Sequence, residues 1–169
     1  MDSLEKTKDS AAYYLGRCSR SEKEVRNYLR RKGFDQEDIE ETILLFKDYG
    51  YIDDRRYCRA FFDYAFGKRW GKYRIFAELE QRGIPQEISS LELEDYLYEK
   101  GIDDNFEKQK AMEVGTRIIR QSDINENQLP EKIKGRIVRR LQSYGYSHSL
   151  IYSVISELER IYTKSEEEF

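Results

Sequence analysis

A short pattern that occurs three times is the feature that most constrains what this chain can form. In residues 21–51, SEKEVRNYLRRKGFDQEDIEETILLFKDYGY, Val25 and Leu29 lie one helical turn apart, Gly33 follows a run of cations, and Phe34 comes directly after the glycine. Glycine suits this place because it adopts the left-handed conformation that ends many helices. The pattern therefore predicts two helices joined by a glycine turn.

The same outline returns in residues 71–101 and 134–160, where Gly83 and Gly145 take the place of Gly33. The apolar positions that align are Val25, Ile75 and Ile137; Leu29, Leu79 and Leu141; and Phe34, Ile84 and Tyr146. A short motif repeated in tandem is typical of a helical array, in which each unit packs against the next.

Composition favours helices as well. The chain has 2 prolines in 169 residues, and its 14 Tyr and 8 Phe supply apolar area although 37% of the residues are charged. The sequence predicts an all-α fold of three tandem three-helix repeats that form an elongated, curved array. The predicted divisions are a flexible N-terminus (1–8), repeat 1 (9–52), repeat 2 (53–102), repeat 3 (103–162) and a flexible tail (163–169).

Three local features complete the expected organisation. The first helix is expected to start at Asp9 or Ser10. A longer helix is expected to start at Asp53 and Asp54 and to end at Gly67, with Tyr64 on its apolar side. Pro85 suits the first turn of the following third helix, in which Glu92, Glu94 and Asp95 interrupt the apolar pattern. Residues 121–129 form the longest expected loop.

The sequence offers little that could support catalysis. Cys18 and Cys58 are far apart and outside any paired motif, so both are expected to be buried thiols without a disulfide or zinc site. His148, the one histidine, lies at the start of the last expected helix and is interpreted as a capping-region residue. Phosphate-loop, nucleophile-elbow and zinc-protease motifs are absent. We expect no enzyme activity, no metal and no cofactor.

The N-terminus has neither the cationic start nor the apolar stretch of a signal peptide, and no apolar run approaches the length of a membrane span. We therefore expect an intracellular protein that does not enter the membrane.

The net charge of −3 conceals a regular alternation of sign. Lys and Arg outnumber acids by seven to two, seven to one and seven to three in residues 17–32, 55–74 and 117–140, whereas acids prevail by six to one and ten to two in 35–48 and 78–107. Charged outer helix faces with i,i+4 pairs would explain part of this pattern. We favour the alternative, a surface for a large polyanionic or bipolar partner, because five successive blocks alternate.

The basic blocks supply the candidate contact residues. They are Arg20, Lys23, Arg26, Arg30 and Arg31; Lys68, Arg69, Trp70, Lys72, Tyr73 and Arg74; and Lys132, Lys134, Arg136, Arg139 and Arg140. The second group lies in GKRWGKYR, residues 67–74, a mixture of cations and aromatics that suits phosphate neutralisation and stacking. The same segment is equally compatible with a helix junction in which Trp70 is a packing anchor.

A helix-turn-helix transcription factor is a rival interpretation of residues 21–49, since two helices meet there at a glycine-containing turn. Its second helix would have to enter the major groove. That helix carries Asp35, Glu37 and Asp38 at its start and is acidic throughout, so phosphates would repel it. Base reading by this helix is therefore disfavoured.

Several runs in this sequence carry a family resemblance. They are AAYYLGRCSRSEKEV, LRRKGF, YGYIDDRRY, RWGKYRI, ELEQRGI and RRLQSYGYS, in this order. Together they resemble the RecX family of bacterial recombination regulators over roughly residues 9–160. We expect a monomer. The resemblance implies a cytoplasmic protein of three tandem three-helix repeats. It also implies binding in the groove of the RecA filament, with single-stranded DNA inside the filament as a further contact.

The same resemblance implies that the protein restrains RecA strand exchange, ATPase and coprotease activities in DNA repair, recombination and the SOS response. Two alternatives remain open from the residues themselves. One is a non-specific nucleic-acid-binding helical repeat module, and the other is a scaffold for another strongly charged protein. Tight, salt-sensitive binding to bare single-stranded DNA would favour the first of these.

Overall fold

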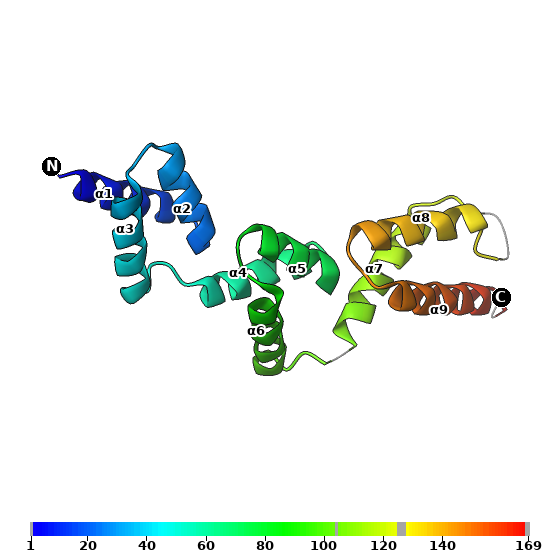
Figure 1. The fold of residues 1–169 in the computed structure, drawn as a ribbon. Helices are drawn as coiled ribbons and strands as arrows, with labels where there is room; N and C mark the ends of the chain where they lie inside the picture. Colours follow the sequence, from blue (N-terminus) through cyan, green and yellow to red (C-terminus); the bar gives the residue numbers. More distant parts are fainter. Residues whose placement is uncertain (1, 104, 125–127, 168–169) are drawn as a thin grey trace. The chain divides into compact units, whose positions relative to one another are not determined.

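The computed structural model describes residues 2–103, 105–124 and 128–167, with side chains described as far as Thr163. Within these residues the regular structure is helical (Figure 1) and consists of α1 (Ser3–Leu15), α2 (Glu22–Arg31), α3 (Gln36–Asp48), α4 (Asp54–Gly67), α5 (Lys72–Gln81), α6 (Gln86–Glu99), α7 (Phe106–Arg120), α8 (Glu131–Ser143) and α9 (His148–Glu167). The predicted all-α class is confirmed.

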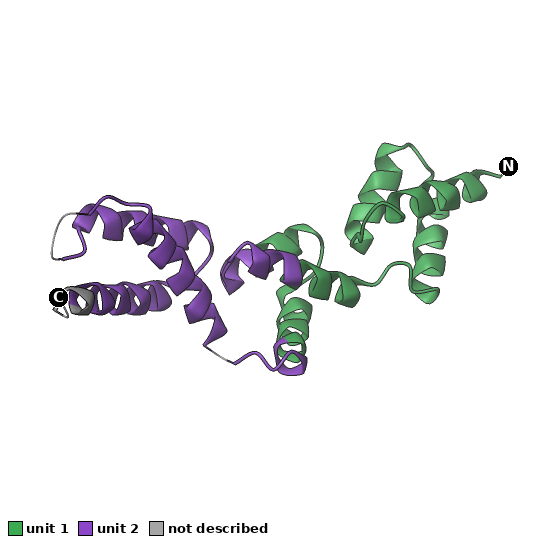
Figure 2. Ribbon diagram, turned by 180° about the vertical axis from the view of Figure 1, so that it is seen from behind, with its two compact units in different colours: residues 1–62, 77–96 green, residues 63–76, 97–169 purple. Residues whose placement is uncertain are grey.

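The helices fall into two compact units, coloured separately in Figure 2. Unit 1 comprises residues 1–62 and 77–96, and unit 2 comprises residues 63–76 and 97–169. The division runs through α4, α5 and α6, so these middle helices contribute to both units. It does not follow the predicted repeat boundaries, which remain a prediction.

Each unit contains a group of three helices that pack on one another, α1–α3 in unit 1 and α7–α9 in unit 2. Their cores contain the apolar positions that the repeat pattern aligns, with Val25 and Leu29 buried in unit 1 and Ile137 and Leu141 buried in unit 2. The aligned residues of the middle repeat, Ile75, Leu79 and Ile84, are fully buried as well. Phe34 is only partly buried.

Three glycine turns have nearly the same backbone conformation. The φ angles of Gly33, Gly83 and Gly145 are 82°, 84° and 81°. In each turn the N–H of the next residue donates to the carbonyl of the aligned leucine, at 3.0 to 3.4 Å. Of the two hydrogen bonds that define a Schellman motif, this is the one that spans more residues. The residue before the donor adopts the left-handed conformation, which favours glycine at that position. The aligned glycines therefore have the same structural role.

The first helix is longer than predicted. α1 begins at Ser3, whose N–H donates to the Asp2 carboxylate at 2.7 Å, so the predicted start at Asp9 or Ser10 is wrong and residues 3–8 are helical. Thr7 is fully buried, which anchors these early turns to the rest of unit 1. At the other end α9 continues to Glu167, into the stretch predicted as a tail. The predicted loop at 121–129 separates α7 from α8, with residues 125–127 outside the described residues.

Glu92 does not prevent α6 from forming. Its side chain is buried, and its carboxylate pairs with Arg55 Nε at 3.3 Å and Arg59 Nε at 3.2 Å, both on α4. A buried carboxylate is tolerated when it is paired in this way. The acidic interruption of the apolar pattern is therefore an ion-paired contact between two helices of unit 1.

Three single-residue predictions have mixed outcomes. Cys58 is buried as predicted, whereas Cys18 is exposed, so its predicted burial is wrong. Tyr64 was expected on the apolar side of α4 but is 53% exposed. None of the described helices combines the length and apolar character needed to cross a membrane.

Candidate polyanion-binding site

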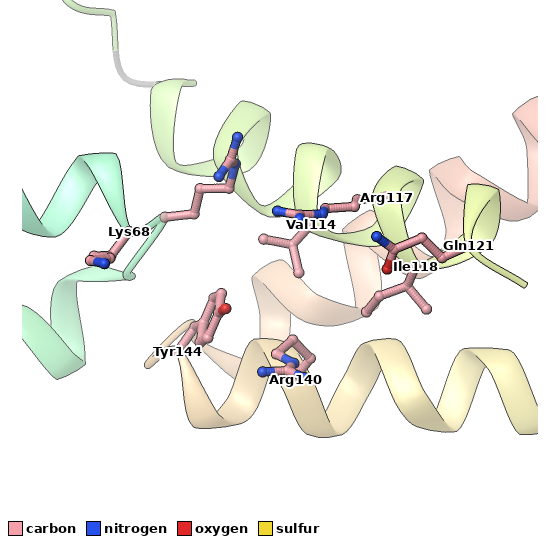
Figure 3. A pocket seen from close by; sticks show the side chains of 8 residues that line it. Lys68, Val114, Arg117, Ile118, Gln121, Arg140 and Tyr144 are labelled. Atoms are coloured by element: carbon pink, nitrogen blue, oxygen red, sulfur yellow. The ribbon is translucent and has the colours of Figure 1, made fainter.

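A shallow pocket in unit 2 gathers several basic side chains. It has a volume of about 290 Å³ and lies between α7, α8 and the residues that follow α4. Its lining residues are Lys68, Arg69, Val114, Arg117, Ile118, Gln121, Arg140 and Tyr144, which we call the basic pocket. In the close-up, side chains from α7 face Arg140 and Tyr144 across the opening (Figure 3).

Three cations of the basic pocket are free of carboxylate partners. Lys68, Arg117 and Arg140 are exposed, and none lies within 4.0 Å of an acidic group in the described part of the chain. Lys68 and Arg140 instead lie over aromatic rings, at 5.7 Å from the Tyr64 centroid and 5.6 Å from the Tyr144 centroid. Like charges gathered without counter-ions attract an anion that can contact several of them at once.

Arg69 is held by its neighbours. Its Nε pairs with Glu113 at 2.8 Å, and its carbonyl accepts a hydrogen bond from the Tyr146 hydroxyl at 2.7 Å. Burial raises the pKa of Tyr146, which keeps this phenol protonated as a donor. Arg69 has a φ of 59°, which costs free energy in a residue other than glycine. These contacts fix the strained turn that carries Lys68 into the basic pocket.

The floor of the basic pocket is apolar. Val114 is buried, Ile118 is partly buried, and the partly buried ring of Tyr144 stands beside the Arg140 guanidinium. A second hollow adjoins it along α7. In addition to residues shared with the first, it is lined by Gln109, Met112, Glu113, Thr116 and Arg120. Cations over an apolar and aromatic floor suit a phosphate backbone or an acidic peptide, whose charges the cations neutralise.

The predicted residues on and before α2 are largely engaged within unit 1. Arg26 pairs with Glu40 and with Glu22, the latter at 2.8 Å, and its side chain is only 20% exposed. The hydrogen bond to Glu40 is the main reason that the pKa of Arg26 is raised, while burial opposes it. Arg26 was predicted as a contact residue, and its pairing makes it a poor candidate for a partner contact.

The other members of this group differ in how free they are. Arg20 lies over the Tyr14 ring at 4.6 Å, and Lys23 Nζ donates to the Gln81 carbonyl at 3.1 Å. Arg30 donates to the Gln36 side chain at 3.3 Å. Arg31 is exposed and has no ion-pair partner among the described residues.

The aromatic and basic cluster at 67–74 is mainly a junction between helices. Arg74 stacks over Trp70 at 3.9 Å and donates to the Ser143 carbonyl at 3.0 Å. Lys72 lies 4.0 Å from the Glu107 carboxylate. Tyr73 is 66% exposed. The packing-anchor alternative therefore describes Arg74 and Lys72 well, and the structure brings only Lys68 and Arg69 of this group to the basic pocket.

The third predicted group lies on α8, and its members have different surroundings. Lys134 pairs with Glu159 of α9 at 2.6 Å, and Arg136 donates to the Ser122 hydroxyl at 3.3 Å. Lys132 and Arg139 are exposed away from the lining of the basic pocket. Arg140 alone of this group lines it.

Sequence reasoning missed most of the residues that line the two hollows, including four polar or aromatic ones. Arg117, Arg120, Gln121 and Tyr144 line the two hollows but were not among the predicted contact residues. A signal existed for two of them, because Arg117 and Arg120 belong to the basic block at 117–140 and recur at a helical interval. Tyr144 gave no such signal, since its place beside Arg140 depends on the end of α8.

No cluster of metal-ligating side chains occurs within the described ranges. His148 is the first residue of α9 and is exposed, in line with its interpretation as a capping-region residue.

Two family models match the chain. The first three-helix domain of RecX matches residues 8–44, and the second three-helix domain of RecX matches residues 53–91. Among whole proteins, the regulatory protein RecX of Clostridium botulinum strain Alaska E43 is 30% identical over 160 residues, which span 92% of this chain and 70% of the relative. That of strain Eklund 17B is 29% identical with the same coverage.

Solved structures share the fold. A crystal structure of RecX from Lactobacillus salivarius superposes with a TM-score of 0.75 at 23% identity and covers 93% of this chain and 97% of its own. A second crystal structure, of a regulatory protein RecX, gives a TM-score of 0.72 at 20% identity and covers 92% of this chain and 72% of its own. These matches support the predicted tandem arrangement of three-helix repeats.

Proposed function

Because this chain belongs to the RecX family of regulatory proteins, we propose that it binds the filament that the RecA recombinase forms on DNA and restrains RecA activity. The activities concerned are strand exchange, ATP hydrolysis and coprotease function. In this proposal the chain acts by binding and carries out no chemistry of its own.

The basic pocket is the observation that carries the proposal. Lys68, Arg117 and Arg140 lie around one apolar floor without carboxylate partners in the described chain, although most other cations of the site prediction are paired or packed. A RecA–DNA filament presents anions in two forms, the phosphates of its DNA and the acidic side chains of its protein. Either form could occupy such a pocket, since both are recognised by charge-assisted hydrogen bonds.

A double charge reversal tests the proposal. Arg117→Glu with Arg140→Glu removes two free cations of the basic pocket. Each charge-assisted contact contributes about 1.5–3 kcal/mol, so losing even one raises the concentration needed for half-inhibition of RecA strand exchange by about tenfold or more.

Lys6→Glu with Arg160→Glu is the matched control, because it makes the same change in net charge at exposed positions outside the basic pocket. We expect inhibition by this control to stay within about twofold of the original. Circular dichroism checks that both variants remain helical. Equal inhibition by the two double variants would remove the basic pocket from the proposal, and no inhibition by the unaltered chain would remove the proposed function itself.

Direct binding of single-stranded nucleic acid is a second candidate, which the partly exposed Tyr144 ring beside Arg140 favours. A base can stack on a tyrosine while adjacent cations hold its phosphates. This function predicts tight binding to bare single-stranded DNA with a steep dependence on salt. Feeble binding to bare DNA together with strong binding to the filament would exclude it.

A further inference from the structure

The same kind of helix junction occurs in both units: the start of one helix packs on the glycine turn that ends another. In unit 1 the start of α2 lies on the glycine turn at the end of α5. The Ser21 hydroxyl donates to the Arg82 carbonyl at 2.7 Å, and the Glu22 N–H donates to the Asp54 carboxylate at 2.9 Å. A β-carbon on Gly83 would lie 2.6 Å from that of Lys23, so the two elements are in close contact.

In unit 2 the start of α5 lies on the glycine turn at the end of α8 in the same way. The Gly71 N–H donates to the Tyr144 carbonyl at 2.7 Å, and the Lys72 N–H donates to the Glu107 carboxylate at 2.9 Å. A β-carbon on Gly145 would lie 2.4 Å from the backbone nitrogen of Arg74. In both junctions one carbonyl of the turn accepts from the N-cap residue, and a carboxylate from a neighbouring helix accepts from the next N–H.

The turn at Gly33 has the same backbone conformation, but among the described residues no helix start packs on it. Gly33 ends α2 with a φ of 82°, and a β-carbon built there would meet no atom within 4 Å. Among the described residues, no group donates to the carbonyl of Arg31 or Lys32, which correspond to the acceptors of the occupied turns. The surface around residues 31–33, which we call the open turn, is thus a vacant copy of a surface that is filled twice within the chain.

Electrostatics indicate what would fill it. A helix start carries partial positive charge and a helix end carries partial negative charge, so the two attract when placed end to end. The exposed Arg31 and Lys32 add side-chain positive charge to the open turn. The segment seated on Gly83 has Glu22 and Glu24 in its first turn. A seated helix with acids in that turn would therefore complement both the carbonyls and the cations.

We propose that the open turn binds the first turn of a helix in a partner protein, one with a small capping residue and acidic side chains directly after it. In a second copy, the helix starts that align with the start of α2 are not available for this contact. The starts of α2 and α5 are already seated. When the repeats are aligned on their turn glycines, α8 begins about one turn before the position at which α2 begins. The N–H of Lys134, which aligns with Glu22, therefore donates to the Pro130 carbonyl within α8.

A peptide titration tests this inference without RecA, so that its failure is distinct from a failure of the proposed function. The probe is a synthetic peptide of residues 20–32, which includes the segment seated on Gly83, held helical by a side-chain cross-link between positions 27 and 31. The full-length chain is labelled with nitrogen-15, and its amide signals are followed during the titration. We expect shifts centred on residues 31–34, with a dissociation constant of about 1 mM.

Two variants complete the design. A probe with Glu22→Lys and Glu24→Lys should bind at least about tenfold more weakly, and so should the original probe to a chain with Arg31→Glu and Lys32→Glu. A chain with Lys6→Glu, an exposed position on α1, should bind the original probe within about twofold of the unaltered chain.

Each remaining result would overturn the inference. Absence of shifts near Gly33, or shifts of equal size with the charge-reversed probe, would show that the open turn does not select an acidic helix start. Shifts at residues 31–34 that depend on the concentration of the chain alone would assign this surface to a second copy instead of a partner protein.

Discussion

Alanine substitutions at the three aligned glycines separate the strain of the turn from the contact made by the helix seated on it. Gly33, Gly83 and Gly145 share a φ near 80°, so alanine meets the same left-handed penalty at each position, about 1–2 kcal/mol. The neighbours differ, because an added β-carbon is free of contacts at Gly33 and collides at the other two.

The collision is most severe at Gly145. Its added β-carbon would lie 2.4 Å from the Arg74 backbone nitrogen, so the start of α5 would have to move away. That movement breaks the hydrogen bonds from Gly71 to the Tyr144 carbonyl, 2.7 Å, and from Tyr73 to the Gly145 carbonyl, 3.2 Å. Leaving such groups unpaired costs about 1–3 kcal/mol each, so we expect an additional loss of about 2–6 kcal/mol from the two bonds.

Gly83→Ala should fall between the other two. Its nearest neighbour is the Lys23 side chain, with the β-carbon at 2.6 Å and the δ-carbon at 2.7 Å. The outer part of a lysine can turn aside, but its β-carbon moves only with the helix. Gly33 and Gly83 both belong to unit 1, so their comparison does not depend on differences between the units.

Urea unfolding followed by far-ultraviolet circular dichroism measures the free energy of unfolding of each variant. The expected order of destabilisation is Gly145→Ala, then Gly83→Ala, then Gly33→Ala. Equal destabilisation of all three variants would refute the conclusion that a helix start packs on the turns at Gly83 and Gly145 while the turn at Gly33 is open.

Three further predictions concern other parts of the chain. Cys18 should react with a thiol reagent in the folded protein, whereas Cys58 should react only on unfolding, because burial raises the pKa of Cys58 to about 12. Mass spectrometry counts the modified thiols, and rapid modification of both would contradict this prediction. Burial raises the pKa of the Asp54 carboxyl above 3.8, so the folded state holds this proton more tightly than the unfolded chain and loses stability as pH rises through the folded pKa. The free energy of unfolding, measured relative to Asp54→Asn, should therefore decline as pH rises from about 4. A flat or rising difference would show that the sign is wrong. Binding along the filament groove predicts that inhibition of RecA ATP hydrolysis grows until the chain is abundant enough to cover the filament, whereas complete inhibition at a small fraction of that ratio would indicate binding at filament ends.

Much of the fold could be predicted because its signals are local. Val25 and Leu29 recur at a helical interval and are buried, and Gly33 occupies the left-handed position that its sequence context indicates. The start of α1 was missed because its anchoring residue is Thr7, a polar side chain that periodicity does not count as core. Its burial depends on the other helices of unit 1.

The candidate site was predicted less well, because charge in the sequence does not reveal which cations are free. Arg26 looked available but is paired with Glu40 on α3, and Lys134 is paired with Glu159 on α9. Arg117 was passed over as a contact residue, yet it has no acidic partner in the described chain. Ion pairing joins residues that are distant in sequence, so residue spacing cannot predict it.

The sequence by itself determined the helices, their repetition and the glycine turns, since these depend on interactions between residues within one or two helical turns of each other. The tertiary structure decided which of the three turns carry a seated helix and which cations line the basic pocket. Both outcomes depend on which distant segments meet, as when Lys68, Arg117 and Arg140 come together from three parts of the chain.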